Sequence, residues 1–217
     1  MKSVALAKQG WLGAVLIFSS TCALGQDLKP IQLPKPQTDI GRPLMQVLKD
    51  RHSSREFSPE KLPPQVISNL LWAAFGINRP DSDKRTAPSA MNWQEMDIYI
   101  ATADGLFVYD AKANQLKPVV AEDVRGQTGS QPFVKDAPVN LVYVAELAKA
   151  RTEAADRDLF LAADAGFIAQ NVYLFCASEG LATVVRGSVD RATLAKTMRL
   201  HPGQRIILAQ TVGYLRK

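Results

Sequence analysis

The sequence has few of the residues that most often carry hydrolytic or metal chemistry. Among its 217 residues are two cysteines and two histidines, His52 and His201. It contains no Gly-x-Ser-x-Gly pattern, and no group of histidines and cysteines has the spacing of a metal site. Ser188 and His201 could be imagined as a hydrolytic pair, but nothing in their spacing supports it. These absences argue against a hydrolase and against a resident metal ion.

The sequence also lacks a strong excess of charge of one sign. It has 26 Lys and Arg against 21 Asp and Glu, which gives a formal net charge of +5. This excess is weak and is scattered along the chain, whereas nucleic-acid binding calls for basic residues clustered on one surface. We therefore expect no nucleic-acid partner.

The apolar run near the N-terminus is short. It extends from Trp11 to Phe18, whereas ~20 apolar residues are needed to cross a bilayer. Lys2 and Lys8 precede the run, and the small-x-small pattern Ala23-Leu24-Gly25 follows it. This order is typical of a cleavable Sec-type signal peptide. We predict that residues 1–25 are a signal peptide and that no stable membrane anchor remains after cleavage.

Cleavage would leave a periplasmic or secreted chain that begins at Gln26. Cys22 does not indicate a lipoprotein, because the preceding Ser19-Ser20-Thr21 lacks the aliphatic residue that such a site needs. Removal of the signal peptide also removes Cys22, so Cys176 would have no partner for an intrachain disulfide. A buried packing role is expected for this thiol.

The remaining chain has the size of one domain, since ~100–200 residues is the usual unit. Residues 26–41 carry spaced prolines among polar residues and are predicted to form an extended N-terminal tether. The folded domain is predicted to cover residues 42–217. Apolar periodicity, turn residues and helix-capping signals within it predict helices and strands at the following positions. Helices are expected at 43–50, 64–75, 156–178 and 192–200, and strands at 96–100, 106–109, 114–119, 139–145, 184–185 and 206–212.

The order of these elements has no strict strand-helix-strand alternation. This order indicates an α+β fold with a central mixed sheet flanked by helices. Residues 77–95 are predicted to be a long polar connection, and residues 126–130 a mobile stretch. Small residues on the longest helix, among them Ala162, Ala163 and Gly166, would let another backbone approach, either from the same chain or from a dimer partner.

A seven-residue segment after the first predicted helix has the composition of an oxyanion site. Arg51-His52-Ser53-Ser54-Arg55-Glu56-Phe57 combines two guanidiniums, an imidazole and two hydroxyls. Arginine presents a planar set of donors that matches phosphate oxygens, and serine hydroxyls add donors without bulk. A solvated basic turn is the alternative reading of this segment.

A second polar segment, Pro88-Ser89-Ala90-Met91-Asn92-Trp93-Gln94, precedes a predicted strand. Its hydroxyl and amides could contact the edge of a heterocycle. Together the two segments resemble the FMN-dependent nitroreductase family, whose members carry Arg-[Arg/His]-Ser-x-[Arg/Lys] and later Pro-Ser-x-x-Asn-x-Gln. Glu95 stands where that family usually has proline. The Asp104–Asp110 segment most resembles the SagB-type dehydrogenase branch.

The resemblance implies an interlocked homodimer with FMN between the subunits. It implies that Arg51, His52, Ser53 and Arg55 hold the phosphate and the nearer ring edge, with Arg55 as the candidate for tuning the redox potential. Five further positions are implied. Ser89 and Asn92 would contact the ring, backbone amides near Arg186 and Gly187 would face flavin N5, and Arg216 would reach the phosphate.

The resemblance further implies two-electron transfer between NAD(P)H or another donor and a nitro, quinone or related acceptor. The SagB-type branch would instead oxidise a peptide heterocycle or other substrate, and a non-catalytic flavin-binding module is a third reading. The signal lacks twin arginines, so export of an unfolded chain would require FMN to be acquired outside the cytoplasm. Nicotinamide donors are scarce there.

Overall fold

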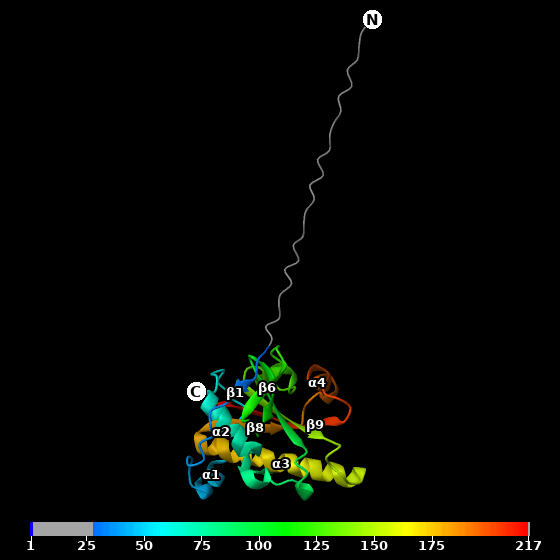
Figure 1. The fold of residues 1–217 in the computed structure, drawn as a ribbon. Helices are drawn as coiled ribbons and strands as arrows, with labels where there is room; N and C mark the ends of the chain where they lie inside the picture. Colours follow the sequence, from blue (N-terminus) through cyan, green and yellow to red (C-terminus); the bar gives the residue numbers. More distant parts are fainter. Residues whose placement is uncertain (2–27, 217) are drawn as a thin grey trace.

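The computed structural model describes residue 1 and residues 28–216. The predicted signal peptide, apart from Met1, therefore lies outside the described residues. Figure 1 shows the described chain as a central sheet with helices on both of its faces.

The sheet has seven strands in the order β1-β6-β5-β4-β7-β9-β8. Their bounds are β1 Ile31–Gln32, β4 Met96–Thr102, β5 Gly105–Asp110, β6 Gln115–Val120, β7 Val139–Glu146, β8 Leu181–Arg186 and β9 Gln204–Tyr214. All six pairings are antiparallel, which refines the expected mixed sheet. A helix joins the parallel strands β7 and β8, but β9 lies between them and runs opposite to both. β8 is left as an edge strand.

Four helices flank the sheet: α1 Leu44–Asp50, α2 Pro64–Phe75, α3 Ala154–Glu179 and α4 Arg191–Thr197. Side chains alternate across a strand, so β4 sends Ile98 and Ile100 into one apolar cluster and Tyr99 into another. The first cluster also contains residues of α2 and α3, and the second contains Leu194 of α4. The helices therefore cover opposite faces of the sheet (Figure 1).

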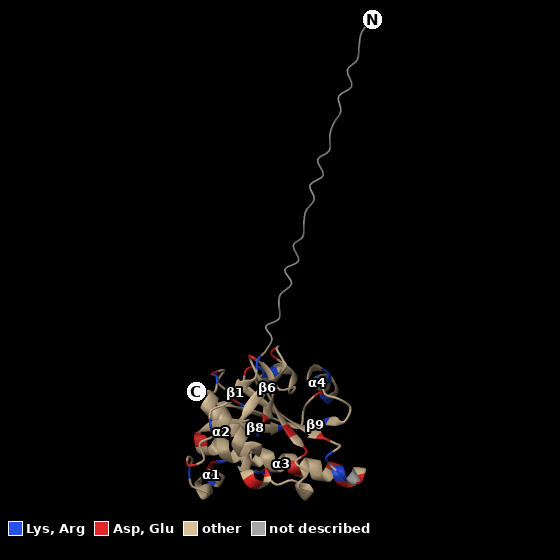
Figure 2. Ribbon diagram, in the orientation of Figure 1, with Lys and Arg blue, Asp and Glu red and all other residues tan. Residues whose placement is uncertain are grey.

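Local signals explain several element boundaries. Pro64 stands at the first turn of α2, where its missing N–H costs nothing. Gly180 ends α3 with a φ of 70°, a left-handed conformation that favours glycine. Asp190 caps α4 by accepting a hydrogen bond from Thr193 N at 3.1 Å. Charged residues of both signs are interspersed over the loops and helices, and the sheet is largely uncharged (Figure 2).

By length and composition, α3 could cross a membrane, since an 18-residue window in it has a mean hydropathy of 1.4. Its apolar residues have another explanation, because Leu161, Ile168, Val172 and Cys176 are buried against the sheet and α2. Burial of Cys176 confirms its predicted packing role and raises the pKa of its thiol far above the ordinary value.

The predicted tether at residues 26–41 is corrected in the part that the structure describes. Its backbone is extended, but β1 pairs with β6, Leu33 is buried, and Gln37 N donates to Asn69 Oδ1 at 2.8 Å. The prolines exclude a helix yet allow an extended chain to cover a sheet edge. This segment is thus part of the domain.

Two loop predictions are also corrected. The connection at 77–95 contains the short hairpin of β2 (Ile77–Arg79) and β3 (Lys84–Arg85) and two 3-10 turns. Residues 126–130, predicted to be mobile, enclose the fully buried Thr128, whose hydroxyl donates to Arg125 O at 2.8 Å. Polar composition indicated flexibility there, but buried hydrogen bonds hold the loop.

Candidate functional site

The arginine-rich segment that follows α1 lies along the open edge of the sheet. Ser54 N donates to Thr183 O of β8 at 2.9 Å, and Phe57 forms an antiparallel bridge with Leu215. Arg216 binds the C-terminal end of this segment. Its backbone N donates to Glu56 O, and its Nε donates to Phe57 O at 3.2 Å. Residues 51–57 and the C-terminal residues therefore meet at one edge, named here the β8 edge.

Tyr173 of α3 joins this segment to the end of β8. Its hydroxyl lies 2.8 Å from Ser53 Oγ and accepts a hydrogen bond from Val185 N at 3.0 Å. Its ring lies 5.2 Å from the Arg51 guanidinium carbon, within cation–π range. Tyr173 thus brings Arg51 and Ser53 beside the strand end that leads into Arg186. The sequence analysis missed this residue, whose only signal was a hydroxyl-bearing aromatic within an apolar helix.

The charged groups of the β8 edge are open to solvent. His52 and Arg55 are exposed and Arg51 is half-buried. Among the described residues, neither Arg51 nor Arg55 takes part in any ion pair. His52 Nδ1 donates to the backbone oxygen of Asp50 at 2.8 Å, because a carbonyl can only accept. Most of the arginine donors therefore remain available to an anion.

The Arg186 side chain points into the interior and has only 3% of its surface exposed. It donates to Thr211 Oγ1 (3.1 Å), Thr128 O (2.7 Å) and Asn140 Oδ1 (3.1 Å). Desolvation lowers the pKa of this guanidinium to about 10, so it stays charged at neutral pH. A Cβ at Gly129 would lie 1.8 Å from its Nη1, which explains glycine there. The side chain supports the fold and does not reach the surface.

The backbone after Arg186 is different. Gly187 is exposed, and a Cβ built on it would meet nothing within 4 Å. Within the described protomer, glycine is therefore not required there by packing, and a ligand could approach the backbone closely.

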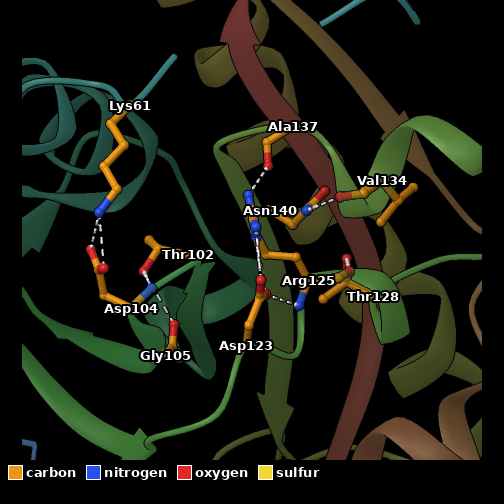
Figure 3. A network of polar contacts seen from close by, with 10 residues as sticks. All are labelled: Lys61, Thr102, Asp104, Gly105, Asp123, Arg125, Thr128, Val134, Ala137 and Asn140. Atoms are coloured by element: carbon orange, nitrogen blue, oxygen red, sulfur yellow. Dashed lines mark hydrogen bonds and ion pairs between the residues drawn. The ribbon is translucent and has the colours of Figure 1, made fainter. Parts of the chain in front are cut away.

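Figure 3 shows the surroundings of this buried network. Asn140 Nδ2 donates to Val134 O at 2.8 Å, and Arg125 Nη1 donates to Ala137 O at 3.0 Å. Arg125 also lines a cavity of about 480 Å³, together with Lys61 and Arg216. In this cavity Lys61 donates to Asp104 at 2.9 Å (Figure 3). Arg216 thus lies between the cavity and the β8 edge.

The loop with Ser89 and Asn92 lies on another part of α3. Ala90 N donates to Asp164 Oδ2 at 2.9 Å, and Trp93 packs edge-on against Phe160 at 5.8 Å. Within the loop, Ser89 Oγ accepts from Gln94 N at 3.0 Å. Asn92 is exposed, and its φ of 55° lies in the left-handed region. The loop is ordered by its own bonds and presents Asn92 outward.

One protomer does not bring all the predicted residues together. The loop is fixed at Asp164 and the β8 edge at Tyr173, nine residues apart on α3, which corresponds to ~13 Å of helix. Arg51, His52, Ser53, Arg55, Gly187 and Arg216 gather at the β8 edge, whereas Ser89 and Asn92 form a second group.

Comparisons with known proteins agree on one family. A model described as "Nitroreductase family" matches residues 48–214. A protein of Methanocaldococcus jannaschii named "Putative nitroreductase" is 30% identical over 174 residues, which cover 75% of this chain and 85% of that protein.

Solved structures show the same architecture. A crystal structure described as a "putative nitroreductase" from Ralstonia eutropha JMP134 is 42% identical and has a TM-score of 0.84, covering 90% of this chain and 93% of that chain. A chain of the Escherichia coli microcin synthetase McbBCD complex has a TM-score of 0.66 at 18% identity, with coverage of 96% and 85%. The second likeness concerns the fold alone.

Proposed function

Because the chain belongs to the nitroreductase family, we propose that it is an FMN-dependent oxidoreductase that binds its cofactor at the β8 edge. The family assignment and the α+β nitroreductase-like fold are confirmed by the comparisons. Bound FMN would supply two-electron chemistry at N5, between NAD(P)H or another donor and a nitro, quinone or related acceptor. The protein's part is to bind, orient and tune the cofactor.

The observation that carries this proposal is the junction made by Tyr173. One hydroxyl holds the phosphate-binding candidate Ser53 and the backbone of β8 at 2.8 and 3.0 Å, while the ring supports Arg51. A site for FMN needs anion donors at one end and a close backbone approach at the other. The β8 edge has both, in the open donors of Arg51 and in the unobstructed Gly187.

The donor set fits a phosphomonoester. Such a group carries roughly −1.5 to −2 charge at neutral pH and three acceptor oxygens. Arg51, Ser53, Arg55 and Arg216 would offer charged and neutral donors to it, and His52 lies next to them. Arg55 is also the candidate for a positive charge near the pyrimidine end, where it would favour the electron-rich cofactor.

We propose that Ser89 and Asn92 contact the FMN held by a second copy of the chain. Their loop lies ~13 Å along α3 from the Tyr173 junction in the same protomer. Helix α3 also exposes two large apolar side chains, Phe167 between these two points and Leu159 before Asp164. A homodimer formed on this face would cover the surface and bring the two groups of residues together.

The small residues of α3 support the homodimer. A glycine inside a helix costs about 1 kcal/mol relative to alanine. Gly166 is exposed, and a Cβ at this position would meet nothing within 4 Å, so packing within the described protomer gives no reason for it. Ala162 and Ala163 are exposed beside it. A partner backbone at close approach would account for this surface.

Analytical ultracentrifugation tests the dimer. Gly166→Arg should convert a dimer into a monomer that still folds, because the new side chain has free space within the protomer. A monomeric unmutated protein that still holds one FMN per chain would contradict the shared site.

We also propose that the protein acts outside the cytoplasm, after cleavage of residues 1–25. The electron donor there would be a periplasmic reductant if NAD(P)H is absent. Fractionation of cells that express the full chain tests this location. Protein found only in the cytoplasm with its first 25 residues intact would exclude it.

Reconstitution tests the cofactor assignment. The protein is incubated with FMN, desalted, and its visible absorbance compared with that of the Arg51→Ala, Arg55→Ala variant. The unmutated protein should stay yellow and the variant should lose its flavin. Lys196→Ala, which removes an exposed positive charge on α4, is the matched control and should retain FMN. Equal retention by all three proteins would remove the site assignment.

Anaerobic titration of the reconstituted protein then tests the reaction. Bleaching by NADH or NADPH, followed by recovery of colour with a quinone or nitroaromatic, is expected for a reductase. Reduction of the bound flavin by an oxidisable substrate, with no reaction toward nicotinamides, would indicate the opposite direction, as in SagB-type dehydrogenases.

A further inference from the structure

Glu95 carries a carboxyl group that is buried without an N–H or hydroxyl donor. It directly follows the loop of residues 88–94 and has 0% of its surface exposed. No N–H or hydroxyl group of the described residues donates to Oε1 or Oε2. An ionised carboxylate in that condition costs several kcal/mol, because the interior does not replace its lost hydration. The proposed function gives this residue no role, and the resemblance noted in the sequence would put proline here.

A second buried carboxyl lies against Glu95. Asp164 of α3 is 3% exposed, and the carboxyl groups of the two residues are within hydrogen-bonding reach. Two ionised carboxylates cannot donate to each other, so this contact requires a proton on one of them. Burial, followed by the charge and the hydrogen bond of Asp164, raises the pKa of Glu95 to about 7.

Among the described residues, the other charged group that acts on Glu95 is Lys149. Its Nζ donates to Gln94 O at 3.2 Å, and its charge favours the ionised form of Glu95 less than burial disfavours it. The backbone oxygen of Glu95 accepts from Glu146 N at 2.9 Å, which fixes the residue at the start of β4.

We propose that Glu95 and Asp164 share one proton and that this acid pair positions the loop of residues 88–94. Asp164 is the link, since its Oδ2 accepts from Ala90 N at 2.9 Å while its carboxyl group meets Glu95. The pair thus connects the start of β4, helix α3 and the loop backbone through one chain of hydrogen bonds.

The backbone of this loop is strained and needs stabilising contacts. Met91, Asn92 and Gln94 all have φ values near 50°, a region that is unfavourable for residues other than glycine. Loss of the shared proton would place two negative charges side by side in the interior. The repulsion would weaken the hold of Asp164 on Ala90 and loosen the loop. The consequence for cofactor binding rests on the proposed function, whereas the shared proton does not.

The direction of the pH effect follows from the raised pKa. In the unfolded chain Glu95 loses its proton near 4.5, and in the folded protein it keeps it up to about 7. The folded state therefore binds more protons between these values, so stability falls as the pH rises through this interval and levels off above it. The unfolding equilibrium constant should rise by about tenfold per pH unit in this interval from this group alone.

Chemical unfolding of the flavin-free protein from pH 5 to pH 8.5 tests the proposal. Glu95→Gln keeps an amide donor for Asp164 and cannot ionise, so it should lose this part of the pH dependence and be more stable than the unmutated protein at pH 8. Glu122→Gln, at an exposed carboxylate, is the matched control and should follow the unmutated profile. Parallel profiles for the unmutated protein and Glu95→Gln would overturn the shared proton.

A local measurement separates positioning from a general stability effect. Fluorine NMR of 5-fluorotryptophan at Trp93, assigned with Trp93→Phe, reports on the loop, because Trp93 packs on Phe160 one turn from Asp164. Its resonance should shift or broaden between pH 6 and pH 8 in native protein, and this change should be absent in Glu95→Gln. A pH-independent resonance would overturn the positioning role.

The unmutated protein offers a third readout, which holds if the variant does not fold. Carbon NMR with labelled glutamate should show one side-chain carboxyl that titrates near neutral pH. Titration of every glutamate below pH 5.5 would overturn the proposal. All three measurements are made without FMN, so their failure and a failure to bind FMN are distinguishable.

Discussion

The buried network around Arg186 and the open β8 edge use the same functional group in opposite ways. The Arg186 guanidinium is desolvated, and three protein oxygens accept its hydrogen bonds. Arg51 and Arg55 lie nearer the surface, outside the ion pairs of the described residues, and Arg51 only stacks on Tyr173. A buried charge must be satisfied by the protein, whereas a surface guanidinium can be left for a ligand. The first region maintains the fold, and the second is available for function.

Gly129→Ala should have the largest effect on the free energy of unfolding, because it disrupts the buried network around Arg186. The new Cβ would lie 1.8 Å from Arg186 Nη1, so the guanidinium would lose its place and the buried Thr128 O would lose its donor. We expect a loss of about 3 kcal/mol or more in unfolding free energy, measured by urea denaturation.

Gly126→Ala is the matched control, since its Cβ would meet only Lys135 Cβ at 3.4 Å. It should change stability by less than about 1 kcal/mol. Equal effects of the two substitutions would mean that Arg186 does not hold this loop.

Arg51→Ala should have the next largest effect, and on binding instead of stability. A charge-assisted hydrogen bond contributes about 1.5–3 kcal/mol, so FMN affinity should fall by one to two orders of magnitude. Fluorescence titration of FMN measures this. Unchanged affinity, together with a loss of stability like that expected for Gly129→Ala, would show that Arg51 supports the fold, as Arg186 does, and does not bind the cofactor.

Tyr173→Phe tests the link between the two regions. The phenyl ring keeps the stacking on Arg51, but Val185 N and Ser53 lose their hydroxyl partner. We expect a stability loss of about 1 kcal/mol by urea denaturation. FMN affinity should fall by less than it does in Arg51→Ala. A neutral result in both assays would show that Ser53 is held without the hydroxyl.

Gly187→Ala should have the smallest effect on stability, within about 0.5 kcal/mol, because its Cβ meets nothing within 4 Å. Its effect should appear in the FMN titration, where the methyl group would stand in the path of the cofactor. Destabilisation by thermal unfolding without any change in FMN affinity would show that the glycine serves the fold.

Most of the fold was predictable from the sequence because its signals are local. The alternation of Met96, Ile98 and Ile100 and the continuous apolar run of β7 are confirmed as buried strands. The helix signals at Pro64 and Gly180 mark real boundaries. The antiparallel insertion of β9 between β7 and β8 was not predictable, because it depends on pairing between distant strands.

The site was less predictable than the fold. Composition indicates Arg51 and Ser53 as candidates but cannot show that Arg186 points inward, because a buried and an exposed arginine look alike in a sequence. It also missed Tyr173, which acts through contacts across 120 residues of chain. The sequence predicts a mobile stretch at 126–130 because the acceptor role of Thr128 toward Arg186 depends on tertiary structure.

The comparison of FMN with riboflavin, which lacks the phosphate, tests the central claim most directly. If the β8 edge binds the phosphate, the unmutated protein should bind FMN at least about a hundredfold more tightly than riboflavin. The Arg51→Ala, Arg55→Ala variant should bind the two flavins with nearly equal affinity. Equal affinities for the two flavins, or a preference that survives in the variant, would contradict the account.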